Sequence, residues 1–198
     1  MHLPAVTSPP AVLAASDGGE PGVLVQVMLL GVRVTAYAII NGAEHRRREA
    51  AGLGAVIDPG LLGRLMDLPI GIPVTDPVVW AEVADQRRGV VERAQDTARV
   101  TRRLESPLTI TDVVVDAVAG GELRAVQEAS LFAGFSRRWI AGRFGRIADA
   151  AMLEAKLCGV GIVDQRRGEL LAAEQPHGLT RDGWSWLLEE KAYRRWLT

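Results

Sequence analysis

The sequence predicts an α+β protein with two parts, and three observations lead to this class. The first is a pair of strand-like segments near the N-terminus that Gly31 separates, and polar and apolar side chains alternate in the second of them. The second is a series of segments with helical periodicity that Gly and Pro residues interrupt. The third is a terminal stretch that carries three of the five tryptophans. Together they predict an N-terminal part with a β-hairpin, and a C-terminal part of three helices, a second hairpin and an aromatic helix.

Length and composition exclude several classes of protein. The chain has 198 residues, of which 48% are hydrophobic, so it is able to bury a core. Its single cysteine, Cys158, excludes an internal disulfide and a zinc site built from several thiolates. The 23 basic and 24 acidic side chains give a net charge of -1. That balance excludes coating of nucleic acid or anionic membrane by bulk charge, but it leaves open a local basic patch.

The composition also changes along the chain and indicates three regions. Residues 1–20 are rich in Ala, Pro, Ser and Gly, which is typical of a flexible leader. Residues 21–105 form the expected N-terminal α+β part, and residues 106–198 the C-terminal part. The boundary follows from Pro107, because proline would end an amphipathic helix expected over Trp80–Leu104.

The most apolar stretch of the chain, Val23–Ile40, is interpreted as a hairpin and not as a membrane span. Arg33 lies inside it, and a charge near the centre of a membrane helix costs about 2.5–3.5 kcal/mol. Its Val, Ile, Thr and Tyr residues favour strands, expected over 23–30 and 32–40. We therefore expect no membrane association and a cytoplasmic location.

Two short helices are expected in the rest of the N-terminal part. The charged run Glu44–Glu49 is typical of a solvated helix start. Residues Leu61–Leu68 form an apolar segment between turn-forming prolines and glycines, which predicts a second helix.

The C-terminal part begins with a series of helix signals. Thr109 and Asp112 are three residues apart, as in a capping box, and Ile110–Val118 keeps a helical face. After two glycines, Glu122–Ala133 predicts a second helix. After Gly134, Ser136 is expected to cap a third helix that continues toward Lys156.

This order of elements resembles the helix-turn-helix family of DNA-binding domains. The residues that carry the resemblance are Ala129, Ser130, Ala133, Gly134, Phe135, Ser136 and Ile140. Two strand-like segments, 159–163 and 169–173, follow with a short tip between them, so residues 109–174 resemble the winged variant. The resemblance implies that the third helix lies in the major groove of double-stranded DNA and that the hairpin tip contacts the adjacent backbone.

The resemblance implies a regulatory DNA-binding function, with the site on the expected third helix and the hairpin tip. Arginine suits such a site because its planar fork of donors pairs with phosphates and with guanine. No acid lies between positions 134 and 148. No cofactor or metal is expected for this function. The predicted nucleic-acid-binding residues are Ser136, Arg137, Arg138, Arg143, Arg146, Arg166 and Arg167.

A competing hypothesis treats Thr111–Gly120 as a strand, because Val113, Val114 and Val115 are β-branched. Asp112 or Asp116 would then lie near Glu128 at neighbouring strand ends. Paired carboxylates of this kind hold Mg²⁺ and activate water for phosphodiester cleavage. The pattern is similar to the PD-(D/E)xK nuclease family, except that Ser130 stands where the family has lysine. The two hypotheses require opposite structures over residues 111–119.

The C-terminal segment predicts a helix with a large aromatic face, formed by Trp184, Trp186, Tyr193 and Trp196. One interpretation is a helix that docks on its own domain. The alternative is a surface that binds a protein partner or a second copy of the chain, because Trp, Tyr and Arg are enriched in interface hot spots.

Overall fold

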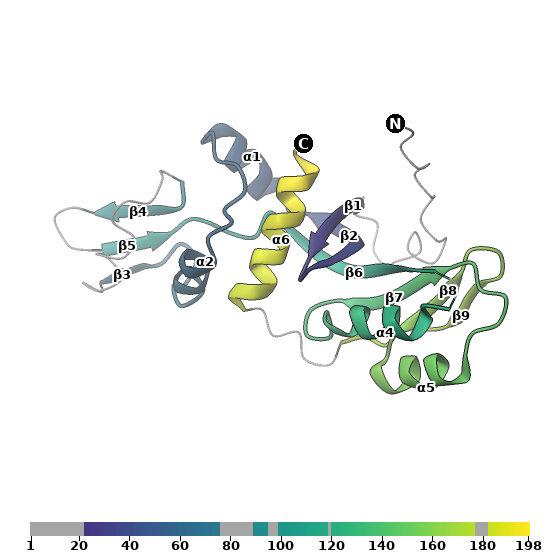
Figure 1. Cartoon of the computed structure of the whole chain (residues 1–198). Coiled ribbons are helices and arrows are strands. Elements are labelled where there is room, and N and C mark those ends of the chain that lie inside the picture. Colours follow the sequence, from purple (N-terminus) through teal and green to yellow (C-terminus); the bar gives the residue numbers. More distant parts are fainter. Residues whose placement is uncertain (1–21, 76–88, 95–98, 119, 177–181) are drawn as a thin grey trace. The chain divides into compact units, whose positions relative to one another are not determined.

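The structure is a computed structural model, and it describes residues 22–75, 89–94, 99–118, 120–176 and 182–198 (Figure 1). These residues form a mixed α+β fold that divides into two compact units. Unit 1 contains the described residues up to Ile39 and from Ile110 to Pro176. Unit 2 contains Ile40–Thr109 and the described residues from Asp182 onward. This division differs from the expected boundary at residue 106, because the N-terminal hairpin pairs with C-terminal strands and the terminal helix packs in unit 2.

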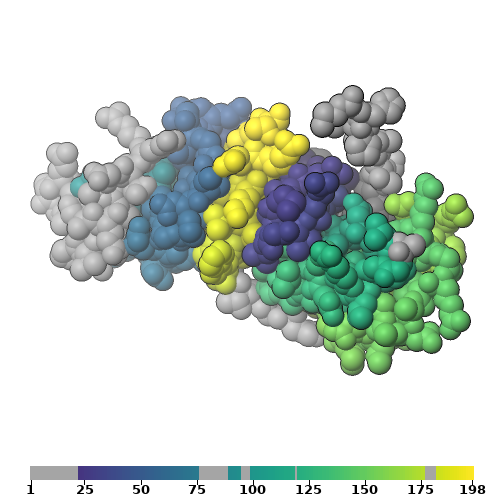
Figure 2. Space-filling view, viewed as in Figure 1, coloured from purple at the N-terminus to yellow at the C-terminus, as the bar shows by residue number. Residues whose placement is uncertain are grey.

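Unit 1 is built on a six-stranded sheet with the order β1-β2-β6-β7-β8-β9. Its strands are β1 (Gly22–Leu29), β2 (Val32–Ile40), β6 (Leu108–Ala117), β7 (Arg137–Gly142), β8 (Gly161–Asp164) and β9 (Gly168–Leu171). The predicted hairpin is confirmed, since β1 and β2 pair antiparallel around a turn at Leu30 and Gly31. Both turn residues have positive φ, 50° and 81°, which matches the right-handed twist of the strands. Figure 2 shows this purple hairpin against the teal segment that contains β6.

Two helices connect the parallel strands of unit 1. Helix α4 (Glu122–Ser130) joins β6 to β7, and α5 (Asp149–Cys158) joins β7 to β8. The helices pack against each other, and α4 also packs on β7 (Figure 1). Their buried faces carry mostly small residues, which allow close approach to the sheet: Ala125, Val126, Ala129, Ala151 and Ala155.

Two of the helices predicted for the C-terminal part are strands over part of their predicted length. Residues 108–117 form strand β6, where Val113, Val114 and Val115 are all buried, and not a helix opened by a capping box. Residues 137–142 form strand β7, and not the start of a recognition helix. A parallel strand between two others buries both of its faces, so its sequence is a continuous apolar run without period-two alternation.

The winged-helix arrangement is therefore not confirmed. Helix α4 and the antiparallel pair β8–β9 match the predicted second helix and the predicted hairpin. The third helix begins only at Asp149, after strand β7 and a loop. Strands β6 and β7 pack tightly at Gly142, because a Cβ atom at this position would lie 2.5 Å from the carbonyl oxygen of Ala117 on β6.

In the described residues, unit 2 combines three helices with a small sheet of order β3-β5-β4. Its elements are α1 (Gly42–Ala50), α2 (Pro59–Met66), β3 (Pro73–Thr75), β4 (Val91–Ala94), β5 (Arg99–Arg102) and α6 (Gly183–Trp196). The predicted terminal helix is confirmed as α6, which Asp182 opens with a capping box to Ser185. The helix expected over residues 80–104 is wrong where the structure describes it, since β4 and β5 lie there; its remaining residues lie outside the described part.

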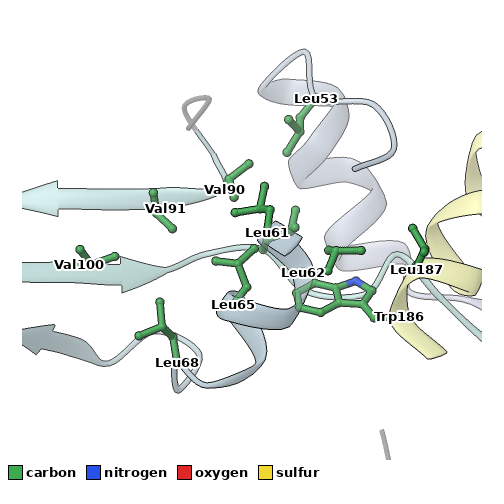
Figure 3. Close-up of a cluster of buried hydrophobic side chains, with 11 residues drawn as sticks. Leu53, Leu61, Leu62, Leu65, Leu68, Val90, Val91, Val100, Trp186 and Leu187 are labelled. Atoms are coloured by element: carbon green, nitrogen blue, oxygen red, sulfur yellow. The ribbon is translucent and has the colours of Figure 1, made fainter. Parts of the chain in front are cut away.

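The core of unit 2 lies between α2, α6 and the small sheet, as Figure 3 shows. It is formed by buried apolar residues from all of these elements: Leu53, Leu61, Leu62, Leu65, Leu68, Val90, Val91, Val100, Leu104, Trp186 and Leu187. Arg102 lies over the ring of Trp186 at 4.5 Å and donates to backbone carbonyl groups of Leu65 and Leu104. Among the described helices, none combines the length and the apolar character that a membrane span requires.

A buried ion-pair network also holds unit 2 together, and it corrects the expectation of a solvated run at Glu44–Glu49. The run is helical, but Arg48 is fully buried in it. Arg48 donates to Oε1 of Glu44 at 2.8 Å and to both carboxylate oxygens of Glu190 on α6 at 2.6 and 2.9 Å. Both glutamates are themselves buried. The charged groups of Glu44, Arg48 and Glu190 are therefore an internal part of the unit and not a solvated face.

Candidate nucleic-acid interface

The three parallel strands of unit 1 end together at one edge of the sheet. The register aligns Ala117 of β6 with Gly142 of β7, and Gly142 with Asp164 of β8. In open α/β sheets, ligands bind outside the carboxyl ends of the parallel strands. The chain leaves this edge after each strand: from β6 toward α4, through the loop 143–148 toward α5, and through the turn 165–167 toward β9. The last two of these segments carry arginines.

These two segments bring four arginines to the same edge of unit 1. Arg143 and Arg146 come from the loop, and Arg166 and Arg167 come from the turn. All four are exposed, and the side chain of Arg146 is 86% accessible. We call this set the arginine edge. An ion pair between Arg146 and Asp149 at 3.6 Å joins two exposed side chains, so it contributes little stability and leaves Arg146 available to solvent ligands.

Asp164 fastens both arginine-bearing segments to the end of β8. Its Oδ2 accepts the backbone N–H of Phe144 at 2.8 Å, and its Oδ1 accepts the N–H groups of Arg166 and Arg167, also at 2.8 Å. These bonds hold the pKa of Asp164 at about 2, chiefly through the Phe144 N–H, against the opposing effect of burial. The carboxylate therefore stays charged, and its oxygens are occupied by the protein's own donors.

Further contacts tie the loop to the turn directly. The backbone N–H of Gln165 donates to the carbonyl oxygen of Gly142 at 2.8 Å, and its side chain accepts from Nε of Arg143 at 3.1 Å. Arg167 donates to the carbonyl oxygen of Phe144 at 2.9 Å. Phe144 itself is buried and anchors the loop. The positions of the arginine backbones are therefore set before any ligand arrives.

Both helices of unit 1 also begin at this edge. The residues that precede them, Gly121 for α4 and Ala148 for α5, make no side-chain hydrogen bond to the first helical turn. The first-turn amides of a helix carry partial positive charge and favour anions nearby. The positive electrostatic potential of these two helix ends adds to that of the four arginines.

The seven predicted nucleic-acid-binding residues do not all share one location. Four form the arginine edge, whereas Ser136, Arg137 and Arg138 lie at the amino end of β7. The strand separates the two groups by about 16 Å. Arg137 is engaged within the protein, because it forms a two-contact pair with buried Asp112 at 2.8 and 2.9 Å. Arg137 therefore does not project outward as the recognition-helix interpretation expected.

The carboxylates of the nuclease hypothesis do not converge either. The decisive segment 111–117 is a strand, as that hypothesis required. Residues 123–130, which the hypothesis needs as a second strand, lie in helix α4. Asp112 is fully buried and accepts from Arg137 and, at 2.9 Å, from Nε1 of Trp139. Asp116 lies four residues farther along β6, about 13 Å away, and desolvation raises its pKa. Glu128 on α4 pairs with Arg124 at 2.8 Å.

No family model matches the chain, and neither a curated protein nor a solved structure is significantly similar to it. Within the ranges that the structure describes, no cluster of three or more His, Cys, Asp or Glu side chains is arranged to hold a metal ion.

The aromatic face of α6 is used mostly inside unit 2. Trp186 and Tyr193 are each 1% exposed, and the hydroxyl of Tyr193 lies 2.9 Å from Nδ1 of His45. Trp196 is half-buried, with its ring 5.0 Å from that of His45. Trp184 is 63% exposed. Of the predicted partner-binding residues, the geometry leaves mainly Trp184 for contact with another molecule.

Asp164 was not among the residues that sequence patterns singled out. The available signal was its place directly before the Gln165-Arg166-Arg167-Gly168 turn. Aspartate at the start of a turn commonly accepts backbone N–H groups two and three residues later, as Asp164 does here. Its bond to Phe144, twenty residues earlier, depends on the parallel pairing of β7 with β8 and has no sequence signal.

Proposed function

We propose that the chain binds the phosphate backbone of double-stranded DNA, in the cytoplasm, through the arginine edge. One observation carries the proposal: Arg143, Arg146, Arg166 and Arg167 come from two separate segments, and Asp164 holds both segments at the carboxyl edge of the sheet. Double-stranded DNA is the partner that the sequence predicts. The proposal uses no recognition helix and does not depend on the winged-helix arrangement.

The chemistry of the edge favours phosphate contacts. A guanidinium presents several donors in one plane and pairs with two phosphate oxygens at once. Contacts to the backbone fix the position of a protein on the duplex without reading its sequence. The net charge of -1 is compatible with this local function, because Asp164 directs its charge toward internal N–H groups. The proposed activity is binding to DNA of any sequence.

A triple variant tests the proposal by fluorescence anisotropy with a labelled duplex at low salt. Replacing Arg143, Arg146 and Arg166 by Ala is expected to weaken binding about 100-fold, if each contact contributes about 1 kcal/mol. Arg167 is kept because it also holds Phe144.

The matched control removes the same charge from unit 2, by replacing exposed Arg46, Arg194 and Arg195 with Ala. We expect the control to bind within about threefold of the wild type, since bulk charge contributes little at net charges near zero. Equal loss in both variants, or no binding by the wild-type chain at low salt, would contradict the proposal.

A further inference from the structure

A second group of polar side chains lies at the amino end of β7, outside the arginine edge. Ser136 is 1% exposed and Arg138 is 7% exposed. The Oγ atom of Ser136 and the Nε atom of Arg138 are both enclosed, and neither has a hydrogen-bond partner. Side chains alternate along a strand, so Arg138 points to the face of the sheet opposite to that of Arg137 and its partner Asp112.

The other buried arginines in the described part of the chain show how this protein normally satisfies such a group. Arg48 makes ion pairs with two carboxylates. Arg102 donates to backbone carbonyl oxygens and stacks on Trp186. An enclosed guanidinium nitrogen without an acceptor is costly, because it has lost its contact with water and gained no hydrogen bond in exchange, and Nε of Arg138 is such an atom. Arg138 therefore differs from both, and an anion supplied from solution would satisfy it.

We propose that Ser136 and Arg138 together bind the carboxylate group of a small organic acid. Residues two apart in extended chain lie about 7 Å from one another, and both side chains supply donors. A carboxylate has two oxygens, so one accepts from the hydroxyl and the other from the guanidinium.

Charge balance selects a carboxylate over a phosphate. The site holds a single positive charge, and a carboxylate neutralises it with a single negative one. A phosphate group carries about -1.5 to -2 at pH 7, so it would leave excess negative charge in a buried position. The site is independent of the arginine edge, because Arg138 lies about 13 Å along β7 from Gly142, where that edge begins.

Thermal unfolding of the full chain tests this site, with acetate as the probe and chloride at equal ionic strength as the reference. A ligand that binds only the folded state raises the unfolding temperature as its concentration rises. We expect acetate to raise it in the wild-type chain and to raise it less in the Ser136→Ala variant. In the triple variant of the arginine edge, which lacks the proposed phosphate contacts of that edge, inorganic phosphate is expected to protect less than acetate. The triple variant of the arginine edge, which tests the DNA-binding proposal, should keep the full acetate effect.

The Arg138→Met variant provides the second measurement. It should lose the acetate effect and, in chloride alone, unfold at a temperature no lower than the wild type, because it removes an enclosed donor, Nε, that lacks an acceptor. Absence of an acetate effect in the wild type, an equal effect in the wild type and Ser136→Ala, or stronger protection by phosphate than by acetate in the triple variant would each overturn the proposal. A large drop in stability or loss of folding of Arg138→Met in chloride would overturn it too, since Arg138 would then serve an internal contact.

Discussion

Replacing Asp164 by Ala is expected to weaken duplex binding at least about tenfold, even though it makes the chain more positive. Asp164 accepts three backbone N–H groups, from Phe144, Arg166 and Arg167, and these bonds fix the loop and the turn that carry the arginines. Without them the arginines would have to be ordered during binding, at a cost in entropy. Fluorescence anisotropy with the same labelled duplex at low salt measures the change.

A second acidic residue serves as the control for charge. Asp149 is 92% exposed and lies 3.6 Å from Arg146, so Asp149→Ala changes the net charge by the same amount and leaves the three N–H bonds intact. We expect Asp149→Ala to bind as tightly as the wild type or slightly more tightly. If Asp164→Ala also binds more tightly, then total charge and not the fixed geometry of the arginine edge determines affinity.

Replacing Arg48 by Met is expected to lower the free energy of unfolding of unit 2 by about 3–5 kcal/mol at neutral pH, because it leaves a buried carboxylate without its cation. Glu190 loses both contacts from Arg48 and retains only the N–H groups of Val56 and Trp186. Urea unfolding measures the change. The control is Arg46→Met on the same helix, where the exposed side chain is expected to change stability by no more than about 0.5 kcal/mol. A loss of similar size in both variants would show that the network contributes nothing specific.

The same variant should weaken the pH dependence of stability. Burial raises the pKa of Glu44, but the hydrogen bonds and charges of Arg47 and Arg48 outweigh it and hold that pKa below its ordinary value of 4.5. In the wild type this contribution is complete above pH 4.5 and is lost as the pH falls below it. In Arg48→Met the hydrogen bond and charge of Arg48 no longer help to hold the pKa of Glu44 low, so this contribution is smaller. The variant should therefore lose less stability than the wild type as the pH falls from neutral to below 4.5.

Several elements could be predicted from the sequence because their signals are local. The Leu30-Gly31 break between two strand-like segments predicted the first hairpin, and the aromatic face of the terminal segment predicted helix α6. Strands β6 and β7 could not be assigned in the same way. A short apolar run such as Val113–Val115 fits a helix face and a buried strand equally well, and only the parallel pairing of these strands in the sheet decides between them.

The location of the candidate site could not be predicted from the sequence either. The sequence identified the arginines of the edge as a set, but their common location depends on the register of β6, β7 and β8, which no local pattern encodes. The same pattern also included Arg137, whose partner Asp112 lies 25 residues earlier. The prediction of a solvated run at Glu44–Glu49 was wrong at Arg48 for the same reason, because Arg48 pairs with Glu190, 142 residues away.

The salt dependence of duplex affinity tests the arginine edge most directly. For a protein that contacts phosphates, the logarithm of the association constant falls linearly with the logarithm of salt concentration, by about 0.9 for each phosphate neutralised. We predict a slope of about -3 to -4 for the wild type and a slope about 2 to 3 units shallower for the variant that lacks Arg143, Arg146 and Arg166. The control without Arg46, Arg194 and Arg195 should keep the wild-type slope. A slope that is the same in all three proteins would contradict the assignment of DNA binding to this edge.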